Sequence, residues 1–377
     1  MSRNLISSIS KCLIIFLIIL LTINILPIDF YVDIEKIIKT KIIYPYASKY
    51  LPHLFIFKSI KNFDYERYSL VFHNVFVFIN FIFISVIIFL HSFFLKNLDE
   101  NKEFLNLFLC SMIFPISLQS VTSPNSESFF SIIIIYLTSL FLCKNSKIRI
   151  VPIMIPLFIY SYLIDSGNSL VFSFFILFLI GMLILNKIFN WKVSFVIFII
   201  LFIVSLFYSK YILSYVGSIF DAHKTSMLIL DLELLSLTNL NVIEILKRYI
   251  YFWFTLFGIV NHFKLFIIST ILMIIVMFCY LGLKTFKNFN FFKQKYYDSK
   301  FIISFCCVFL FPLMLISILP THAYAKYYIF IVPFIIKFLS FYFTKSSLFY
   351  LSTIYSSVFV LNSYLIIYTN SRIMEYT

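Results

Sequence analysis

The chain is dominated by long apolar runs that alternate with short segments containing lysine. A helix needs about 20 apolar residues to cross a bilayer, so such runs are typical of membrane-spanning helices. With 62% hydrophobic and 12% charged residues, the chain has more apolar surface than a soluble fold buries. The sequence predicts an all-α, polytopic transmembrane helix bundle of about eleven spans. We expect the spans near 12–27, 69–95, 105–120, 128–143, 150–164, 169–186, 193–208, 264–283, 301–319, 327–343 and 348–368.

Lysine and arginine are divided unevenly between alternate connections. We expect the first run to be retained as a helix, with the N-terminus in the cytoplasm. The cytoplasmic segments then hold 15 of these residues, and the short outer loops hold one, Lys326. This asymmetry follows the positive-inside rule and predicts the topology. The cytoplasmic segments are 1–11, 96–104, 144–149, 187–192, 284–300 and 344–347, and the short outer loops are 121–127, 165–168 and 320–326.

Two outer connections are much longer than the others, at about 28–68 and 209–248. Connections of this length usually carry function, and we expect short interfacial helices within them. No soluble domain, linker or low-complexity tail is evident in the sequence. Residues 1–377 are therefore predicted to form a single integral membrane domain.

Residues 249–263 are apolar enough to form a further span. A span at this position would place the lysine-rich segment 284–300 outside the cell, against the positive-inside rule. A helix lying at the outer membrane interface suits the aromatic side chains of Tyr249, Tyr251 and Trp253 better. We therefore expect an interfacial helix here.

Composition argues against several other classes of protein. Five glycines and no glycine-rich phosphate loop make nucleotide hydrolysis an unexpected function. The net charge of +14 does not indicate a nucleic-acid partner, because the lysines lie in short segments between apolar runs. The six cysteines lie in or beside apolar runs and lack metal-ligand spacing. We expect no disulfide, no metal site and no cofactor.

Three acidic residues follow directly after the first predicted span, in the segment PIDFYVDIEKI. Asp29 and Asp33 are four positions apart and would share one face of a short helix, and Glu35 lies close by in sequence. A carboxylate at the membrane surface can take a proton from a sugar hydroxyl while that oxygen attacks a lipid-linked donor. The structural alternative is a solvated acidic turn at the end of the helix.

The three short outer loops also contain polar residues. Their carboxylates and amides suit sugar hydroxyls, and a cation beside a histidine and a tyrosine suits a lipid phosphate. Each group also has a structural use, either in capping a helix or in starting a helix at the aromatic belt with a snorkelling lysine. The candidate binding residues are Asn125, Glu127, Asp165, Asn168, His322, Tyr324 and Lys326.

These segments together resemble the polytopic glycosyltransferases of the GT-C superfamily. The similarity lies in an acid after the first helix, Asp29 or Asp33, and in the late motif HAYAKYY at 322–328. The middle segments FPISLQSVTSPNSESFF at 114–130 and DSGNS at 165–169 are similar to the GPI mannosyltransferase II branch. The resemblance implies catalysis on the non-cytoplasmic face and a sugar donor linked to polyprenyl or dolichyl phosphate.

The predicted function is therefore transfer of a sugar from such a donor to a glycan or glycolipid acceptor within a lipid membrane. One alternative is a polysaccharide polymerase of the O-antigen type, whose large outer loops would rely on arginines, here Arg67 and Arg248. The other is a flippase or transporter, which would carry ionisable residues within its spans. Apart from Lys337, His73 and His91, the predicted spans are nearly free of such groups.

The predicted location is a multi-pass position in a bacterial inner or plasma membrane, or in the endoplasmic reticulum membrane of a eukaryote. In both cases the functional face is the non-cytoplasmic one.

Overall fold

In the computed structural model of the chain, the described residues form helices and a few turn residues, with no strand among them. The all-α prediction is thus confirmed for this part of the chain. The described residues are 65–94, 98–122, 128–143, 150–164, 166–188, scattered positions between 193 and 215, 242–257, 299–320, 323, 325–357 and 359–360.

The chain divides into two compact units. The first unit comprises Met1–Tyr136, Phe257–Met277 and Lys345–Thr377, and the second comprises Leu137–Leu256 and Phe278–Thr344. The predicted single membrane domain stays a prediction.

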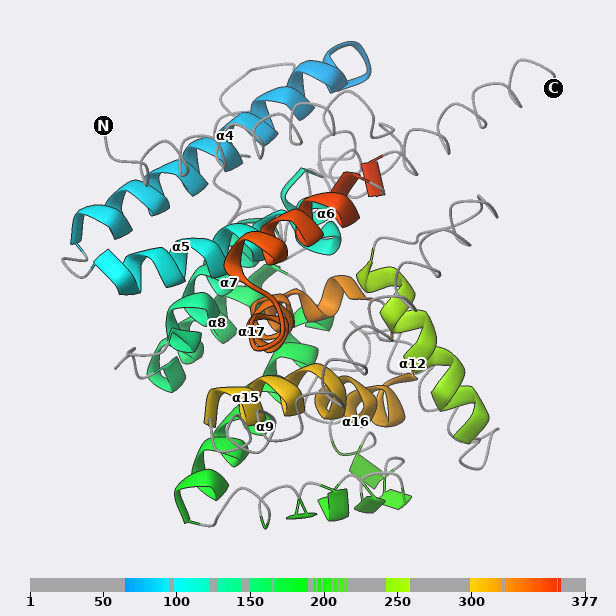
Figure 1. Ribbon diagram of the computed structural model, residues 1–377. Helices are drawn as coiled ribbons and strands as arrows, with labels where there is room; N and C mark the ends of the chain where they lie inside the picture. The colour runs from blue at the N-terminus through cyan, green and yellow to red at the C-terminus, as the bar shows by residue number, and fades with distance from the viewer. Residues whose placement is uncertain are drawn as a thin grey trace. The chain divides into compact units, whose positions relative to one another are not determined.

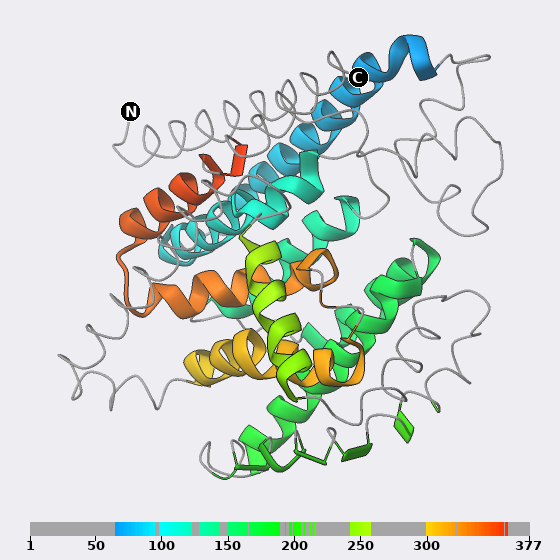
Figure 2. The same ribbon diagram turned by 90° about the vertical axis from the view of Figure 1, so that its right-hand side faces the viewer.

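The first unit contains three helices that pack together: α4 (Tyr65–Phe94), α5 (Leu98–Met112) and α6 (Pro115–Thr122). Helix α7 (Ser128–Leu142) begins in this unit, and residues 345–357 form a further helix. Figures 1 and 2 show α4 as the longest of these ribbons.

Helix α4 has a buried face and an exposed face. Asn80 and His91 are buried, together with Val77 and Ile84. The opposite face is exposed and mostly apolar, and it also includes Ser85. Its exposed large apolar residues are Phe78, Ile82, Val86, Phe89 and Leu90. A helix on the surface of a soluble protein has the reverse arrangement, with its polar face outward.

A sharp bend of 77° separates Lys102–Met112 from Pro115–Val121. Proline has no backbone N–H and disfavours helical geometry at the residue before it, here Phe114, so the break precedes Pro115. The prediction of one unbroken helix over 105–120 is therefore wrong. The predicted cytoplasmic segment 96–104 is also mostly helical, because α5 begins at Leu98.

The second unit contains the remaining labelled helices. Helix α8 packs against α9, α15 packs along α17, and α12 packs against α16 and η5 (Figures 1 and 2). The elements are α8 (Ile150–Ile164), α9 (Ser166–Ile188), α12 (Val242–Leu256), α15 (Ser299–Phe305), η3 (Cys306–Leu310), α16 (Phe311–Ile318), η5 (Ala325–Ile331) and α17 (Val332–Ser340).

Aromatic rings form the centre of the second unit. The ring centroid of Phe175 on α9 lies 5.3 Å from that of Phe311, 4.3 Å from that of Phe330 and 5.7 Å from that of Phe334. Offset and edge-to-face ring pairs of this kind add to the burial of apolar area. The cluster joins α9, α16, η5 and α17 into one packed core.

Helix α15, the π-helical segment η3 and helix α16 follow one another without a gap. Lys300–Ile318, with a mean hydropathy of 2.7, is the one helix among the described residues that is long and apolar enough to cross a membrane. A second is added if the bent α5–α6 pair counts as one span. Buried core helices of soluble proteins have the same length and composition, so the eleven-span topology stays a prediction.

Apart from the bend within 105–120, most predicted helices that can be compared match described helices, with ends that differ by up to four residues. The spans predicted at 69–95, 128–143, 150–164 and 169–186 correspond to α4, α7, α8 and α9. Those at 301–319 and 327–343 correspond to α15–α16 and to η5–α17, and the last begins at residue 345 rather than 348. The spans predicted at 12–27 and 264–283 lie outside the described residues.

Candidate functional site

Most of the predicted site residues lie outside the described part of the chain. These are Asp29, Asp33, Glu35, Asn125, Glu127, Asp165, His322 and Tyr324. Two others have a described backbone: Asn168 lies in the first turn of α9, and Lys326 is the second residue of η5. The structure therefore does not test whether these side chains share one site. It describes the elements that flank the last outer loop.

Arg248, at the end of the second long loop that is predicted to be external, contacts the start of the last predicted outer loop. Arg248 on α12 donates from Nη1 to the backbone carbonyl of Pro320 at 2.8 Å. Its Nε donates to Glu244 Oε1 at 2.9 Å, one helical turn earlier. Two contacts on different edges of the planar guanidinium restrict its orientation. The contact joins segments that lie 72 positions apart in sequence.

The next residue, Tyr249, makes a second contact from α12. Its hydroxyl donates to the backbone carbonyl of Phe309 at 3.1 Å, within the π-helical segment η3. Its ring also packs edge-on against Trp253, with 6.1 Å between centroids. Burial raises the pKa of Tyr249 to about 12, and a hydrogen bond with Trp253 lowers it by less. The hydroxyl therefore keeps its proton and remains a donor at physiological pH.

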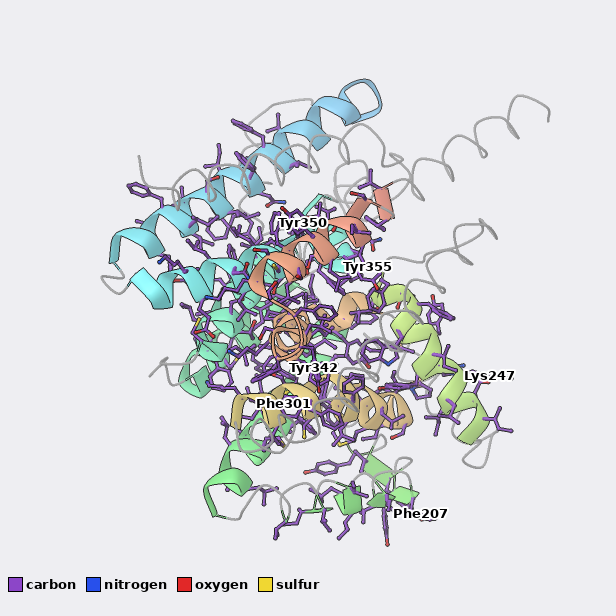
Figure 3. The ribbon with its side chains drawn as sticks, viewed as in Figure 1. Phe207, Lys247, Phe301, Tyr342, Tyr350 and Tyr355 are labelled. Carbon is purple, nitrogen blue, oxygen red and sulfur yellow. The ribbon has the colours of Figure 1, made fainter. Side chains whose placement is uncertain are left out.

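Helix α12 has a packed inner face and an exposed outer face. On the inner face, Phe252 and Leu256 are fully buried, and the Phe252 ring lies 4.8 Å from that of Tyr328 on η5. Lys247 projects from the outer face (Figure 3). The exposed apolar side chains of this face are Ile243, Leu246, Ile250 and Tyr251.

The position of α12 revises the predicted loop boundary. The second long outer loop was expected to run to residue 248, but α12 begins at Val242. The expected interfacial helix over 249–263 is helical as far as Leu256. At about 1.5 Å per residue, α12 is roughly 22 Å long, which is shorter than the hydrocarbon core. Its place at the membrane interface stays a prediction.

The other end of the α15–α16 helix makes a contact between residues that are far apart in sequence. The Lys300 ammonium donates to the carbonyl of Phe141, near the end of α7, and lies 4.0 Å from the centroid of the Phe141 ring. Both residues adjoin segments predicted to be cytoplasmic, 144–149 and 284–300. At the opposite end, Arg248 and Pro320 adjoin loops predicted to be external. The sides of the membrane on which these two ends lie stay a prediction.

Lys337 is one of the few ionisable residues within the predicted spans. Its side chain is buried, in the last turn of α17, and its ammonium lies 5.7 Å from the centroid of the Phe341 ring. Phe341 follows the end of α17, so the ammonium approaches the end of the helix that is predicted to be cytoplasmic. Such a position fits a lysine that keeps its stem among apolar groups.

The first unit has a buried polar region around α6. Asn80 donates from Nδ2 to the carbonyl of Val121 at 2.8 Å, and the Ser120 and Ser131 hydroxyl oxygens are 2.7 Å apart. The buried oxygens of Ser117 and Gln119 have no hydrogen-bond partner among the described residues. Asn80 is near the midpoint of α4, so the loop predicted at 121–127 begins beside the middle of that helix and not beside its end.

The sequence did not predict that Arg248, Tyr249 and Asn80 donate hydrogen bonds to backbone carbonyls of distant segments. Arg248 carried a usable signal, since it was noted as the arginine that ends the second long outer loop. Tyr249 was read as an interfacial aromatic residue, and its carbonyl partner on a distant helix has no sequence signal. Asn80 lies within an apolar run, and a buried amide of this kind requires a partner.

Comparison of the sequence with known protein-family models finds no match. Comparison with curated proteins and with solved structures finds no match either.

Proposed function

We propose that this chain is a multi-pass membrane glycosyltransferase of the GT-C type, which acts on the non-cytoplasmic face. It would transfer a sugar from a polyprenyl- or dolichyl-phosphate donor to a glycan or glycolipid acceptor. The observation that carries the proposal is the hydrogen bond from Arg248 to the Pro320 carbonyl. It brings the end of one long predicted outer loop to the segment that contains His322, Tyr324 and Lys326.

The distribution of polar residues on α4 supports a membrane location. Asn80 and His91 are buried, whereas the exposed face of the same helix is mostly apolar. Membrane helices turn polar residues toward the bundle and apolar residues toward lipid. Exposed apolar surface of this extent on a soluble protein would mark an interaction site.

The chemistry of the proposal uses the predicted site residues in separate roles. Asp29 or Asp33 acts as the general base for the acceptor hydroxyl. His322 and Lys326 bind the phosphate leaving group, and positioning together with stabilisation of the leaving phosphate supplies most of the rate gain. The remaining candidates bind sugar hydroxyls or complete the phosphate site: Glu35, Asn125, Glu127, Asp165, Asn168 and Tyr324.

The alternative of an O-antigen-type polymerase relies on arginines in the outer loops. Arg248 is bonded to both Glu244 and Pro320, which gives it a structural partner on each side. This favours the transferase over the polymerase.

The proposal is tested by transfer of a radiolabelled lipid-linked sugar in isolated membranes. We expect Asp29→Asn or Asp33→Asn to lower transfer by about 10²–10⁴ through loss of general-base catalysis, with normal expression. Lys326→Ala should weaken use of the donor. Asp64→Asn is the matched control, because it makes the same change in the same loop at a residue outside the proposed site. Near-wild-type transfer by the Asp29/Asp33 double variant would remove the first loop from the mechanism.

A further inference from the structure

Helix α12 contacts both ends of α16 through two neighbouring side chains. Tyr249 donates to the carbonyl of Phe309, two residues before α16 begins, and Arg248 donates to the carbonyl of Pro320, two residues after it ends. Between these points α12 packs along α16 and against η5. A rigid helix that is bonded at both ends of another helix limits the movement of the chain at those ends.

Two hydrogen bonds restrict the Arg248 guanidinium to one orientation. The Glu244 carboxylate lies one turn before Arg248 on the same helix and engages Nε, which leaves the outer edge of the guanidinium directed at Pro320. The arginine is about one quarter exposed, so its bonds are partly shielded from water. Hydrogen bonds from a charged group are stronger than those between neutral groups.

We infer that Arg248 is a positioning residue for the segment from Pro320 to η5. The hydrogen bond to the Pro320 carbonyl fixes the position of the backbone at the start of this segment. Ala323, which is buried, lies in sequence between Pro320 and η5. The consequence for catalysis rests on the proposed function, because Lys326 and His322 belong to this segment. The positional role itself does not depend on the proposed function.

The experiment measures alkylation of a cysteine placed at position 323, in native membranes, with a membrane-permeant maleimide and mass-spectrometric mapping. Ala323 is 3% exposed, so Ala323→Cys should react slowly in the otherwise unchanged chain. Adding Arg248→Met removes the donors but keeps the apolar stem, and the rate at position 323 should rise about tenfold or more. Glu244→Gln should give a smaller rise, because a neutral oxygen still accepts from Nε.

Lys247→Met is the matched control, because it removes the same charge from the adjacent, exposed position on α12. It should leave the rate at position 323 unchanged. The native thiols of Cys306 and Cys307 are fully buried in η3 and report general unfolding in the same sample. An unchanged rate at 323 in Arg248→Met would overturn the inference. A parallel rise at Cys306 and Cys307 would also overturn it, since the arginine would then support the whole fold and not this segment.

A second measurement connects the positional role to the reaction. In the transfer assay, Arg248→Met should raise the apparent KM for the lipid-linked donor more than it lowers kcat, and Lys247→Met should change neither. A wild-type donor KM in an active Arg248→Met protein would refute the catalytic consequence. Absence of transfer by the wild-type chain would defeat the proposed function, and the alkylation rates would still decide the positional role.

Discussion

Two apolar helices of this protein are interrupted, one in each unit, and the interruptions differ in kind. In the first unit, the chain bends by 77° between α5 and α6. In the second unit, the π-helical segment η3 lies between α15 and α16, and its flanking residues Phe305 and Phe311 both keep right-handed helical dihedrals. The helix axis continues from α15 through the π segment into α16, whereas it changes direction between α5 and α6.

At both interruptions a backbone carbonyl accepts a hydrogen bond from a side-chain hydroxyl. The Ser356 hydroxyl donates to the carbonyl of Ile113 at the bend, and the Tyr249 hydroxyl donates to the carbonyl of Phe309 in the π segment. A backbone carbonyl inside a membrane or a protein core needs an internal partner, because water is absent there. The backbone also bonds internally in both places, from the Phe311 N–H to the Cys306 carbonyl in the π segment and from the Phe114 N–H to the Ser111 carbonyl at the bend. The Ile113 carbonyl lies where the helix turns by 77°, whereas the helix continues through the π segment, so we expect the bend to depend more on its side-chain donor than the π segment does.

The largest effect is expected from Ser356→Ala, which removes the donor at the bend. The buried Ile113 carbonyl would lose this partner, which should lower the free energy of unfolding by about 1–3 kcal/mol. Unfolding of the purified protein in detergent, titrated with a denaturing detergent, measures this change.

Ser357→Ala is the control for Ser356→Ala. The Ser357 hydroxyl donates to the carbonyl four residues earlier at 2.9 Å and is exposed, whereas the single proton of the buried Ser356 hydroxyl is shared between the Ile113 carbonyl and the Ser352 carbonyl at 2.8 Å. The control should therefore be nearly neutral. Equal effects of the two substitutions would show that the contact with Ile113 does not stabilise the bend.

A smaller effect is expected from Tyr249→Phe in the second unit. The substitution removes one neutral hydrogen bond and keeps the ring, so the free energy of unfolding should fall by about 0.5–1.5 kcal/mol. Tyr251→Phe makes the same change at an exposed position two residues later and should have little effect. If Tyr249→Phe costs more than Ser356→Ala, the proposed difference between bend and π segment is wrong.

Below about pH 10, the smallest effect is expected from pH acting on Tyr249. Its pKa is about 12 in the folded chain, raised by burial, against about 10 for an unfolded tyrosine. A group with a raised folded pKa contributes stability that is fully present below the unfolded pKa and is lost as pH rises through the folded value. The stability difference between wild type and Tyr249→Phe should be constant up to about pH 9 and shrink above about pH 10. A difference that stays constant above about pH 10 would show that the folded pKa is not raised, and would contradict the burial of this hydroxyl.

The sequence predicted helix positions well because hydropathy and charge are local properties. The apolar run at 150–164 has the same bounds as α8, and the run at 128–143 differs from α7 by one residue at its end. The break before Pro115 was missed although the proline is visible in the sequence. Proline in an apolar run is compatible with a continuous helix, as Pro156 inside α8 shows, so its presence alone does not predict a bend.

The candidate site could be predicted only as a set of residues on one face of a membrane. The roles of Asp29, Asp33 and the other outer polar groups stay predictions, because they depend on side chains outside the described residues. Arg248 was noted as an arginine in a loop, but its function as a contact to Pro320 requires a partner 72 positions away.

The sequence by itself determined which segments are helical and apolar, since these follow from the order of neighbouring residues. The tertiary structure decided which side chains complete the interrupted helices. Ser356 and Ile113 are 243 positions apart, and Tyr249 and Phe309 are 60 apart. Such pairs form only when packing brings distant helices into contact, because an unpaired carbonyl is costly away from water and accepts whichever donor the fold places beside it.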